Sequence, residues 1–351
     1  MNDIRRTILW VIFGFSMVLL WDKWQLHNGN KATFFPSPAA VGAAAPAAGA
    51  SAPLAGAASV PASTAPAVAS IGASAVPGTP APAAPAAREK IEVTTDVYRL
   101  TFDGEGGSLT HAELLKHADM TDKAKNFVLF DESTQRVYVA QTGLIGGSFP
   151  THKTVMTAVP GPRALKDGEN ELTIRFESPE QGGVKLVKTW TLKRGAYDIA
   201  VKHEVVNVGS TAVSPQLYLQ LVRDGNKPPG ESSFYSTFTG PAVYTDAKKY
   251  QKIEFKDIEN GKVDIPKESP NGYVAMVQHY FASAWLLADG VQRELFTRKV
   301  SDNLYSVGMI TPLGNIDPGT TKAVDARLFA GPQVETMMEK LYPGLELVKD
   351  Y

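Results

Sequence analysis

Residues 184–209 read VKLVKTWTLKRGAYDIAVKHEVVNVG, and this stretch decides the fold class. It contains two runs in which apolar and polar side chains alternate. The apolar members are Val184, Leu186, Trp190 and Leu192, followed by Tyr197, Ile199, Val201 and Val205. Arg194-Gly195 separates the runs, and Asn207-Val208-Gly209 follows the second. Because a period of two places alternate side chains on one face, the stretch predicts two half-buried strands bounded by turns.

The same alternation recurs through the sequence from Arg88 onward. Further stripes are Ile91, Val93, Thr95 and Val97; Leu172, Ile174 and Phe176; Leu217, Leu219 and Leu221; and Tyr305, Val307 and Met309. Pairs such as Gly106-Gly107 and Asp167-Gly168 lie between them and are typical of turns. Many short strands with such turns predict a mainly β fold, an antiparallel sandwich of two large curved sheets, rather than alternating strands and helices.

A helical pattern is convincing only near the end of the sequence. Val334, Met337, Met338 and Leu341 have the spacing of one helix face, and Pro343-Gly344 follows as a stop signal. We expect this C-terminal helix stripe to pack on the sandwich. A functional interpretation is that the helix also transmits position to whatever follows Tyr351.

The N-terminus has the pattern of a membrane anchor. Residues 7–21 carry no charge, Arg5 and Arg6 precede them, and Trp21 and Trp24 lie near their end. By the positive-inside bias the arginines stay in the cytoplasm, and the tryptophans suit the outer interface. We therefore predict a transmembrane helix over 7–26. The alternative is a cleaved signal peptide, but bulky and charged residues follow the apolar run where a peptidase needs small ones.

A segment of low complexity follows the predicted anchor. Residues 36–87 contain 23 Ala and 10 Pro in 52 positions, with no charged and no aromatic residue. Frequent proline breaks any helical run, and the segment has little large apolar surface to offset the entropy of ordering. We predict a disordered linker over 27–87.

Composition and motifs argue against most kinds of chemistry. Residues 88–351 carry 31 basic and 34 acidic residues, so they lack the basic field that a nucleic-acid partner requires. The sequence contains no cysteine, and its six histidines form no metal-binding spacing. No phosphate-binding loop or nucleophile elbow is present. We predict no enzymatic activity, no catalytic residue, no cofactor and no metal.

One stretch of the β region combines aromatic residues with charged residues. Its members Phe234, Tyr235, Tyr244, Lys249 and Tyr250 form a candidate partner surface, since tyrosine and mixed charge suit a reversible interface. The plainer interpretation is that these are core and rim residues of strands and loops.

The order of these parts resembles the YidC membrane protein insertases of Gram-negative bacteria. The likeness is carried by Asp3-Ile-Arg-Arg6 before an anchor that ends in Trp21-Asp-Lys-Trp24. Further matching stretches are Val93-Thr-Thr-Asp-Val97, Leu192-Lys-Arg-Gly195 and Phe238-Thr-Gly240, then Lys249-Tyr250, Gly331-Pro332 and, most specifically, Gly272-Tyr-Val-Ala-Met-Val-Gln-His-Tyr-Phe-Ala-Ser-Ala-Trp285.

The resemblance implies an anchored protein of the bacterial inner membrane with a β-supersandwich similar to galactose mutarotases. The implied parts are a cytoplasmic N-terminus at 1–6, the anchor at 7–26, the linker at 27–87, a periplasmic supersandwich at 88–332, and, at 333–351, a C-terminal helix and the link to a membrane core. The family assists insertion and folding of inner-membrane proteins, with or without the Sec translocon. Implied partners are the lipid bilayer, the SecD/SecF accessory subunits and nascent membrane proteins. The insertase core of the family is absent from these residues, so we expect them to anchor and to make contacts.

Two other functions stay open from the sequence. A membrane-tethered periplasmic domain that binds or processes sugars would need an aromatic cleft with converging carboxylates. A cleaved, secreted structural β-protein would begin after the apolar run.

Overall fold

The computed structural model describes residues 3–27, 72–78, 88–232, 234 and 237–349 of the chain. Two compact units are present, Met1–Ala67 and Val68–Tyr351. In the first, helix α1 spans Asp3–His27, and the described side chains between Val11 and Trp24 are almost all exposed. Across the described residues, no helix combines the length and the apolar character that a bilayer crossing demands.

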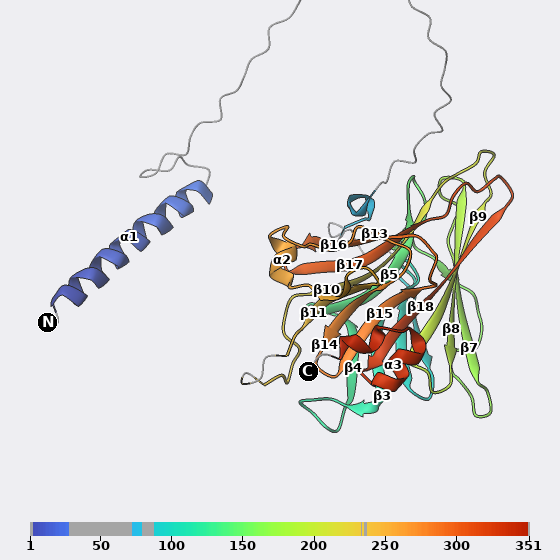
Figure 1. The fold of residues 1–351 in the computed structure, drawn as a ribbon, viewed down its shortest axis with the longest axis horizontal. Helices are drawn as coiled ribbons and strands as arrows, with labels where there is room; N and C mark the ends of the chain where they lie inside the picture. The colour runs from blue at the N-terminus through green and yellow to red at the C-terminus, as the bar shows by residue number, and fades with distance from the viewer. Residues whose placement is uncertain (1–2, 28–71, 79–87, 233, 235–236, 350–351) are drawn as a thin grey trace, which may run out of the picture. The chain divides into compact units, whose positions relative to one another are not determined.

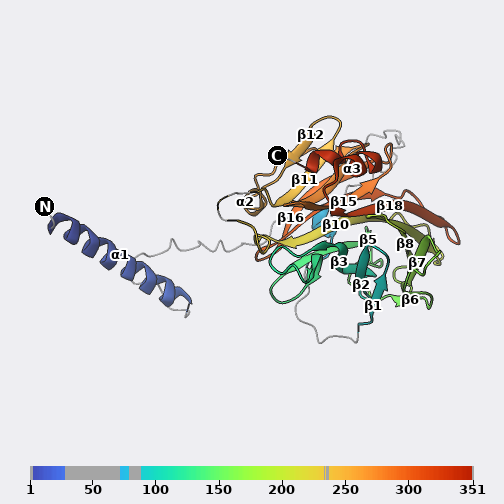
Figure 2. The same cartoon turned by 90° about the horizontal axis from the view of Figure 1, so that it is seen from below.

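The second unit is built from two nine-stranded sheets in which all paired strands are antiparallel (Figures 1 and 2). The first sheet contains, in spatial order, β1 (Lys90–Thr94), β2 (Tyr98–Asp103), β3 (Ser108–Ala118), β4 (Asn126–Glu132), β5 (Val137–Ile145), β10 (Gln216–Asp224), β17 (Leu304–Pro312), β16 (Arg293–Ser301) and β13 (Glu268–Ser269). The second contains β12 (Lys249–Lys252), β11 (Gly240–Thr245), β14 (Tyr273–Gln278), β15 (Phe281–Leu287), β18 (Thr321–Pro332), β9 (Asp198–Asn207), β8 (Val184–Lys193), β7 (Glu171–Glu177) and β6 (Thr157–Ala158). The predicted large antiparallel sandwich is confirmed.

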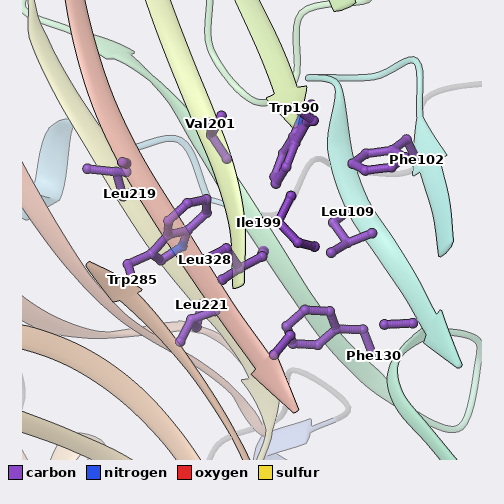
Figure 3. Close-up of a cluster of buried hydrophobic side chains, with 14 of the residues drawn as sticks. Phe102, Leu109, Phe130, Trp190, Ile199, Val201, Leu219, Leu221, Trp285 and Leu328 are labelled. Carbon is purple, nitrogen blue, oxygen red and sulfur yellow. The ribbon is translucent and has the colours of Figure 1, made fainter. Parts of the chain in front are cut away.

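Residues 184–209 form the β8–β9 hairpin. Val184 pairs with Asn207 and Thr191 with Ala200, so the apolar members of both runs share one face. Trp190 of β8 lies in the inter-sheet core with Trp285 of β15, and the two ring centroids are 6.2 Å apart. Each indole N–H finds a backbone carbonyl, at Gly107 for Trp190 and at Gln220 for Trp285. Figure 3 shows these rings among aliphatic side chains from both sheets.

The stripe predicted from Ile91 to Val97 does not continue as one strand. β1 ends at Thr94 and β2 begins at Tyr98, and the chain turns between them. The hydroxyl oxygen of Thr95 accepts hydrogen bonds from the backbone N–H groups of Val97 and Tyr98. A threonine side chain that bonds to nearby backbone favours a turn, which the apolar pattern alone conceals.

Two short α-helices and two 3₁₀ turns complete the described part of the second unit. These are α2 (Phe255–Glu259), α3 (Glu335–Leu341), η1 (Ala73–Ala75) and η2 (Leu345–Val348). α3 ends at Leu341, just before Pro343-Gly344, and Gly344, with φ of 101°, separates α3 from η2. Residues 28–71 and 79–87 of the predicted linker lie outside the described residues, whereas residues 72–78 form a defined turn on the sandwich where disorder was expected.

Candidate functional site

A pocket of about 470 Å³ lies where strands β12 and β14 approach the C-terminal segment. Its lining is contributed by parts of the chain that are far apart in sequence. The lining residues are Thr237, Phe238, Tyr250, Lys252, Val277, Gln278, His279, Tyr280, Gln333, Val348 and Lys349. We call this the β12–β14 pocket.

The hairpin between β14 and β15 forms one wall of the pocket. Gln278 pairs with Phe281, so His279 and Tyr280 are the two residues of the turn. Tyr280 has a φ of 65° and a ring that is 60% exposed. A non-glycine residue in this region costs roughly 1–2 kcal/mol, and such strain is concentrated at binding sites. The turn is fixed from one side by Thr237, whose hydroxyl lies 3.1 Å from Nδ1 of His279.

The pocket combines positive charge with aromatic surface. Lys252 Nζ lies 5.5 Å from the centre of the Phe238 ring, a cation–π distance, and Lys349 Nζ lies 4.0 Å from a Glu335 carboxylate oxygen. None of the described lining residues is Asp or Glu. This environment suits a partner that offers an acidic or hydrogen-bonding group beside an apolar one.

Two buried polar atoms on the pocket wall lack a hydrogen-bond partner within the described residues. These are Oε1 of Gln278, a side chain only 2% exposed, and the hydroxyl of Tyr250. Burial raises the pKa of the Tyr250 hydroxyl above its ordinary value, so it is neutral and can donate. Because buried polar groups are normally paired with protein or with water, these two atoms can each form a hydrogen bond with whatever fills the pocket.

The predicted partner-surface residues fall into different environments. Phe234 is 90% exposed, Lys249 is exposed, and Tyr250 lines the pocket, while Tyr235 lies outside the described residues. Tyr244 differs from the expectation of a surface residue. Its ring is buried and stacks on Tyr273 with ring centroids 5.4 Å apart.

The predicted C-terminal helix stripe packs on the outer face of the second sheet. Met338 is fully buried there, and Met337 and Leu341 pack partly against the same cluster. Val334 differs from the prediction because it precedes the helix as its N-cap residue and is 46% exposed. Figure 2 shows α3 beside β11 and β15. The stripe therefore fixes the C-terminal segment to the wall of the pocket.

Tyrosines that sequence reasoning did not select hold this segment in place. The Tyr342 hydroxyl accepts a hydrogen bond from the Gly272 backbone N–H at 2.8 Å and donates to Asp289 at 2.5 Å. Burial and the Asp289 carboxylate raise the pKa of Tyr342 to about 12. The Tyr273 hydroxyl donates to the carbonyl of Gly344. In the sequence, Tyr342 is visible only as a tyrosine next to Pro343-Gly344, and this position does not indicate its hydrogen-bond partners.

Replacing Tyr342 by phenylalanine should loosen the C-terminal segment. The buried Gly272 N–H would lose its acceptor, which costs about 1–3 kcal/mol. Hydrogen exchange followed by mass spectrometry should show amides of 335–348 exchanging roughly tenfold faster or more. The exposed Tyr280→Phe variant is the control and should exchange as the wild type does. Unchanged protection in Tyr342→Phe would show that apolar packing alone holds the helix.

The predicted anchor residues lie in α1. The rings of Trp21 and Trp24 are tilted against each other with centroids 5.4 Å apart, and the side chains of Arg5 and Arg6 lie outside the described part. In the described ranges, no group of three or more His, Asp or Glu side chains is arranged to hold a metal ion.

Sequence comparison places the chain beside proteins of one kind. Residues 90–351 match the family model described as the YidC periplasmic domain. Proteins named membrane protein insertase YidC from Janthinobacterium sp. (strain Marseille) and from Cupriavidus necator are 47% identical over 351 residues and 50% identical over 349 residues. Each comparison covers 99% of this chain, and the chain spans 61% of the length of these relatives.

Comparison of structures finds proteins of low sequence identity. A galactose mutarotase related enzyme from Lactobacillus acidophilus is 8% identical, with a TM-score of 0.44 over 69% of this chain and 97% of its own. A galactose mutarotase-like protein from Clostridium acetobutylicum is 7% identical, with a TM-score of 0.44 over 70% of this chain and 96% of its own.

Proposed function

The chain belongs to the YidC family of membrane protein insertases, and from this premise we propose that it is the anchor and periplasmic interaction part of such an insertase. The observation that carries the proposal is the family match over residues 90–351 together with the identity of relatives along almost the whole chain. The family acts on membrane proteins and is not a family of enzymes. Helping inner-membrane proteins to insert and fold, with or without the Sec translocon, is the proposed task of the whole protein.

The proposed topology rests on the charge pattern of the N-terminal sequence and on the length of its uncharged run. α1 extends over 25 residues, or roughly 37 Å at 1.5 Å per residue, and Arg5 and Arg6 lie near its start. We place residues 1–6 in the cytoplasm, 7–26 in the inner membrane, and the residues after about 26 in the periplasm. The 15 uncharged residues at 7–21 and the tryptophans that follow support this arrangement.

The topology can be tested with single cysteines, since the natural chain has none. A cysteine placed at Asn2 should resist a membrane-impermeant maleimide in intact spheroplasts, whereas one at exposed Lys202 should react. Reaction at both positions after detergent lysis is the control. Labelling of Asn2 but not of Lys202 in intact spheroplasts would reverse the proposed orientation.

The β12–β14 pocket is the proposed contact surface for partners, which include the SecD/SecF accessory subunits. Its lysines, its aromatic rings and its two unpaired polar atoms support a protein contact. The described lining has no carboxylate pair, so nothing at this pocket favours the alternative of sugar hydrolysis.

A pull-down from solubilised membranes tests the contact. The chain carrying Phe238→Ala and Lys252→Glu should recover at least about tenfold less SecD/SecF than the wild type, the loss expected when a cation–π pair and a charge of the contact are removed. Lys202→Glu, an exposed charge reversal on β9, is the matched control and should leave recovery unchanged. Equal recovery from all three proteins would exclude this pocket as the contact.

A complementation assay tests the assignment of anchoring and contacts to residues 1–351. Cells depleted of their insertase should not be rescued by residues 1–351 alone, whereas the longer parent protein should rescue them. Rescue by residues 1–351 would contradict the assignment of this part to anchoring and contacts.

A further inference from the structure

A short piece of the Pro/Ala-rich segment lies on the outer face of the first sheet. Residues 72–78 contain the turn η1, at which the N–H groups of Ala75 and Val76 bond to the carbonyls of Gly72 and Ala73. Figure 1 shows this turn beside β16. Val76 is 1% exposed, although it belongs to a segment made up mostly of alanine and proline.

The surface under Val76 is separate from the inter-sheet core. It consists of Ile145 of β5, Tyr218 of β10, Ile310 of β17 and Phe296 of β16, with Ala73 packed at its border. The neighbours of Tyr218 along β10, Leu217 and Leu219, belong to the inter-sheet core. Since successive side chains of a strand point to opposite faces, Val76 docks on the outside of the sheet.

Two glycines within the strands shape this surface. Gly143 pairs with Tyr218 and Gly308 pairs with Phe296. A Cβ atom on Gly143 would lie 2.4 Å from the Tyr218 hydroxyl oxygen, and one on Gly308 would lie 2.5 Å from the Phe296 ring. The rings therefore lie down over the glycines and form a flat shelf, which leaves space for the small side chains of residues 73–76.

Arg298 of β16 binds the backbone of the turn. Its guanidinium donates hydrogen bonds to the carbonyls of Ala73 and Val76. Both bonds come from Nη1, whose two N–H groups lie in the guanidinium plane, so the contact is sensitive to the positions of the two carbonyls. Apolar insertion and backbone recognition thus act on the same seven residues.

We propose that residues 72–78 are a docking motif by which the Pro/Ala-rich segment attaches itself to the β5–β10–β17–β16 face. The first strand of the sandwich, β1, is at the opposite edge of this sheet from β16 and β13. Docking therefore moves the point where the segment joins the sandwich across the sheet. It also gives the segment an attachment to the sandwich at residues 72–78, before the chain reaches Arg88.

The sequence contains a second copy of the docked pattern. Gly72-Ala-Ser-Ala-Val-Pro77 is preceded by Gly56-Ala-Ala-Ser-Val-Pro61, with glycine, valine and proline at the same relative positions. The second copy has the same valine and similar small residues in its sequence. We therefore expect residues 56–61 to compete for the shelf when Val76 is replaced.

Hydrogen exchange on the full chain in detergent tests the docking motif. In the wild type the amides of Ala75 and Val76 should be protected relative to a free peptide of residues 70–80. Val76→Asp should speed their exchange by roughly 10- to 100-fold, because a buried valine and its contacts are lost. Arg298→Met should have an effect in the same direction, and Arg298→Lys a smaller one. Val68→Asp, the same substitution in the same segment, is the matched control and should leave these amides as they are.

The readout separates docking from folding. The melting temperature of the sandwich should stay close to that of the wild type in every variant, since β strands and inter-sheet core are unchanged. Exchange of Ala75 and Val76 at free-peptide rates in the wild type would overturn the proposal. So would equal exchange in the wild type and in Val76→Asp. These amides report on residues 72–78 whether or not residues 56–61 take their place.

Discussion

Gly272→Ala is expected to destabilise the sandwich more than any other glycine-to-alanine change outside the inter-sheet core. Gly272 has a φ of 102°, and a Cβ atom there would lie 1.9 Å from the carbonyl oxygen of Tyr244. Overpacking of this kind costs about 1–3 kcal/mol, and a left-handed alanine adds about 1–2 kcal/mol. We therefore expect a loss of about 2–5 kcal/mol in the free energy of unfolding.

The position explains why the strain cannot be relieved locally. The Gly272 N–H donates to Tyr342, and the Gly272 carbonyl accepts from the buried guanidinium of Arg293 at 2.8 Å. A shift of the backbone at Gly272 would disturb both contacts. The clash also affects β11, which pairs with β14 and places Tyr244 opposite Tyr273.

Urea unfolding followed by circular dichroism measures the loss. Gly290→Ala is the matched control, because its φ of 89° is also positive but nothing lies within 4 Å of the added atom. It should lose only the 1–2 kcal/mol of backbone strain. Equal losses in the two variants would mean that the close approach to Tyr244 has no energetic effect.

Lys188 should make the sandwich more stable as the pH rises from 7 to 9.5. The side chain is fully buried, and its ammonium group donates to the carbonyls of Gly106 and Thr142, each at 2.6 Å. No carboxylate partner of Lys188 is found in the described ranges. Burial lowers its pKa to about 7, against about 10.4 in the unfolded chain.

The sign follows from proton binding in the two states. Between pH 7 and 10.4 the unfolded chain holds a proton on Lys188 that the folded chain has released, so the free energy of unfolding rises with pH. Below pH 7 both states are protonated and the cost of the buried charge is fully present. At 1.36 kcal/mol per pH unit, the gain from pH 7 to 9.5 is about 3 kcal/mol.

The Lys188→Met variant removes the titrating group while keeping a similar volume. Its unfolding free energy, measured in urea at pH 7, 8, 9 and 9.5, should lack this rise. Lys185→Met, an exposed position on the same strand, should keep the wild-type slope. Two buried histidines, His152 and His203, have their pKa lowered to about 3, mainly by burial, and so affect stability only at acid pH. The same slope in wild type and Lys188→Met would show that Lys188 is charged at pH 7 and above.

The strands with one buried face were predictable because their side chains alternate. β7 buries Leu172, Ile174 and Phe176 and exposes the residues between them, as the sequence predicts. β10 is buried on both faces, and its outer residue Tyr218 is covered by Val76. No local pattern could reveal that contact, since the two residues are more than 140 positions apart in the sequence.

Sequence reasoning identified only one part of the candidate site. The aromatic and charged residues around Tyr250 marked one wall of the β12–β14 pocket. The other walls come from the His279-Tyr280 turn and from Val348-Lys349, which reach the site through sheet pairing and the docking of α3. For Tyr244 the core interpretation holds, and its partner Tyr273, on the neighbouring strand β14, could not be inferred from the local sequence.

The place of β18 in the second sheet has a consequence for biogenesis. This strand pairs with β15 on one side and with β9 on the other, so it joins the two halves of that sheet. β9 ends at Asn207 but β18 begins only at Thr321, and a ribosome needs on the order of ten seconds to synthesise the residues between them. During that interval the edge of β9 is an open template for wrong pairing. The emerging polypeptide must therefore be kept from aggregating until translation has passed Pro332.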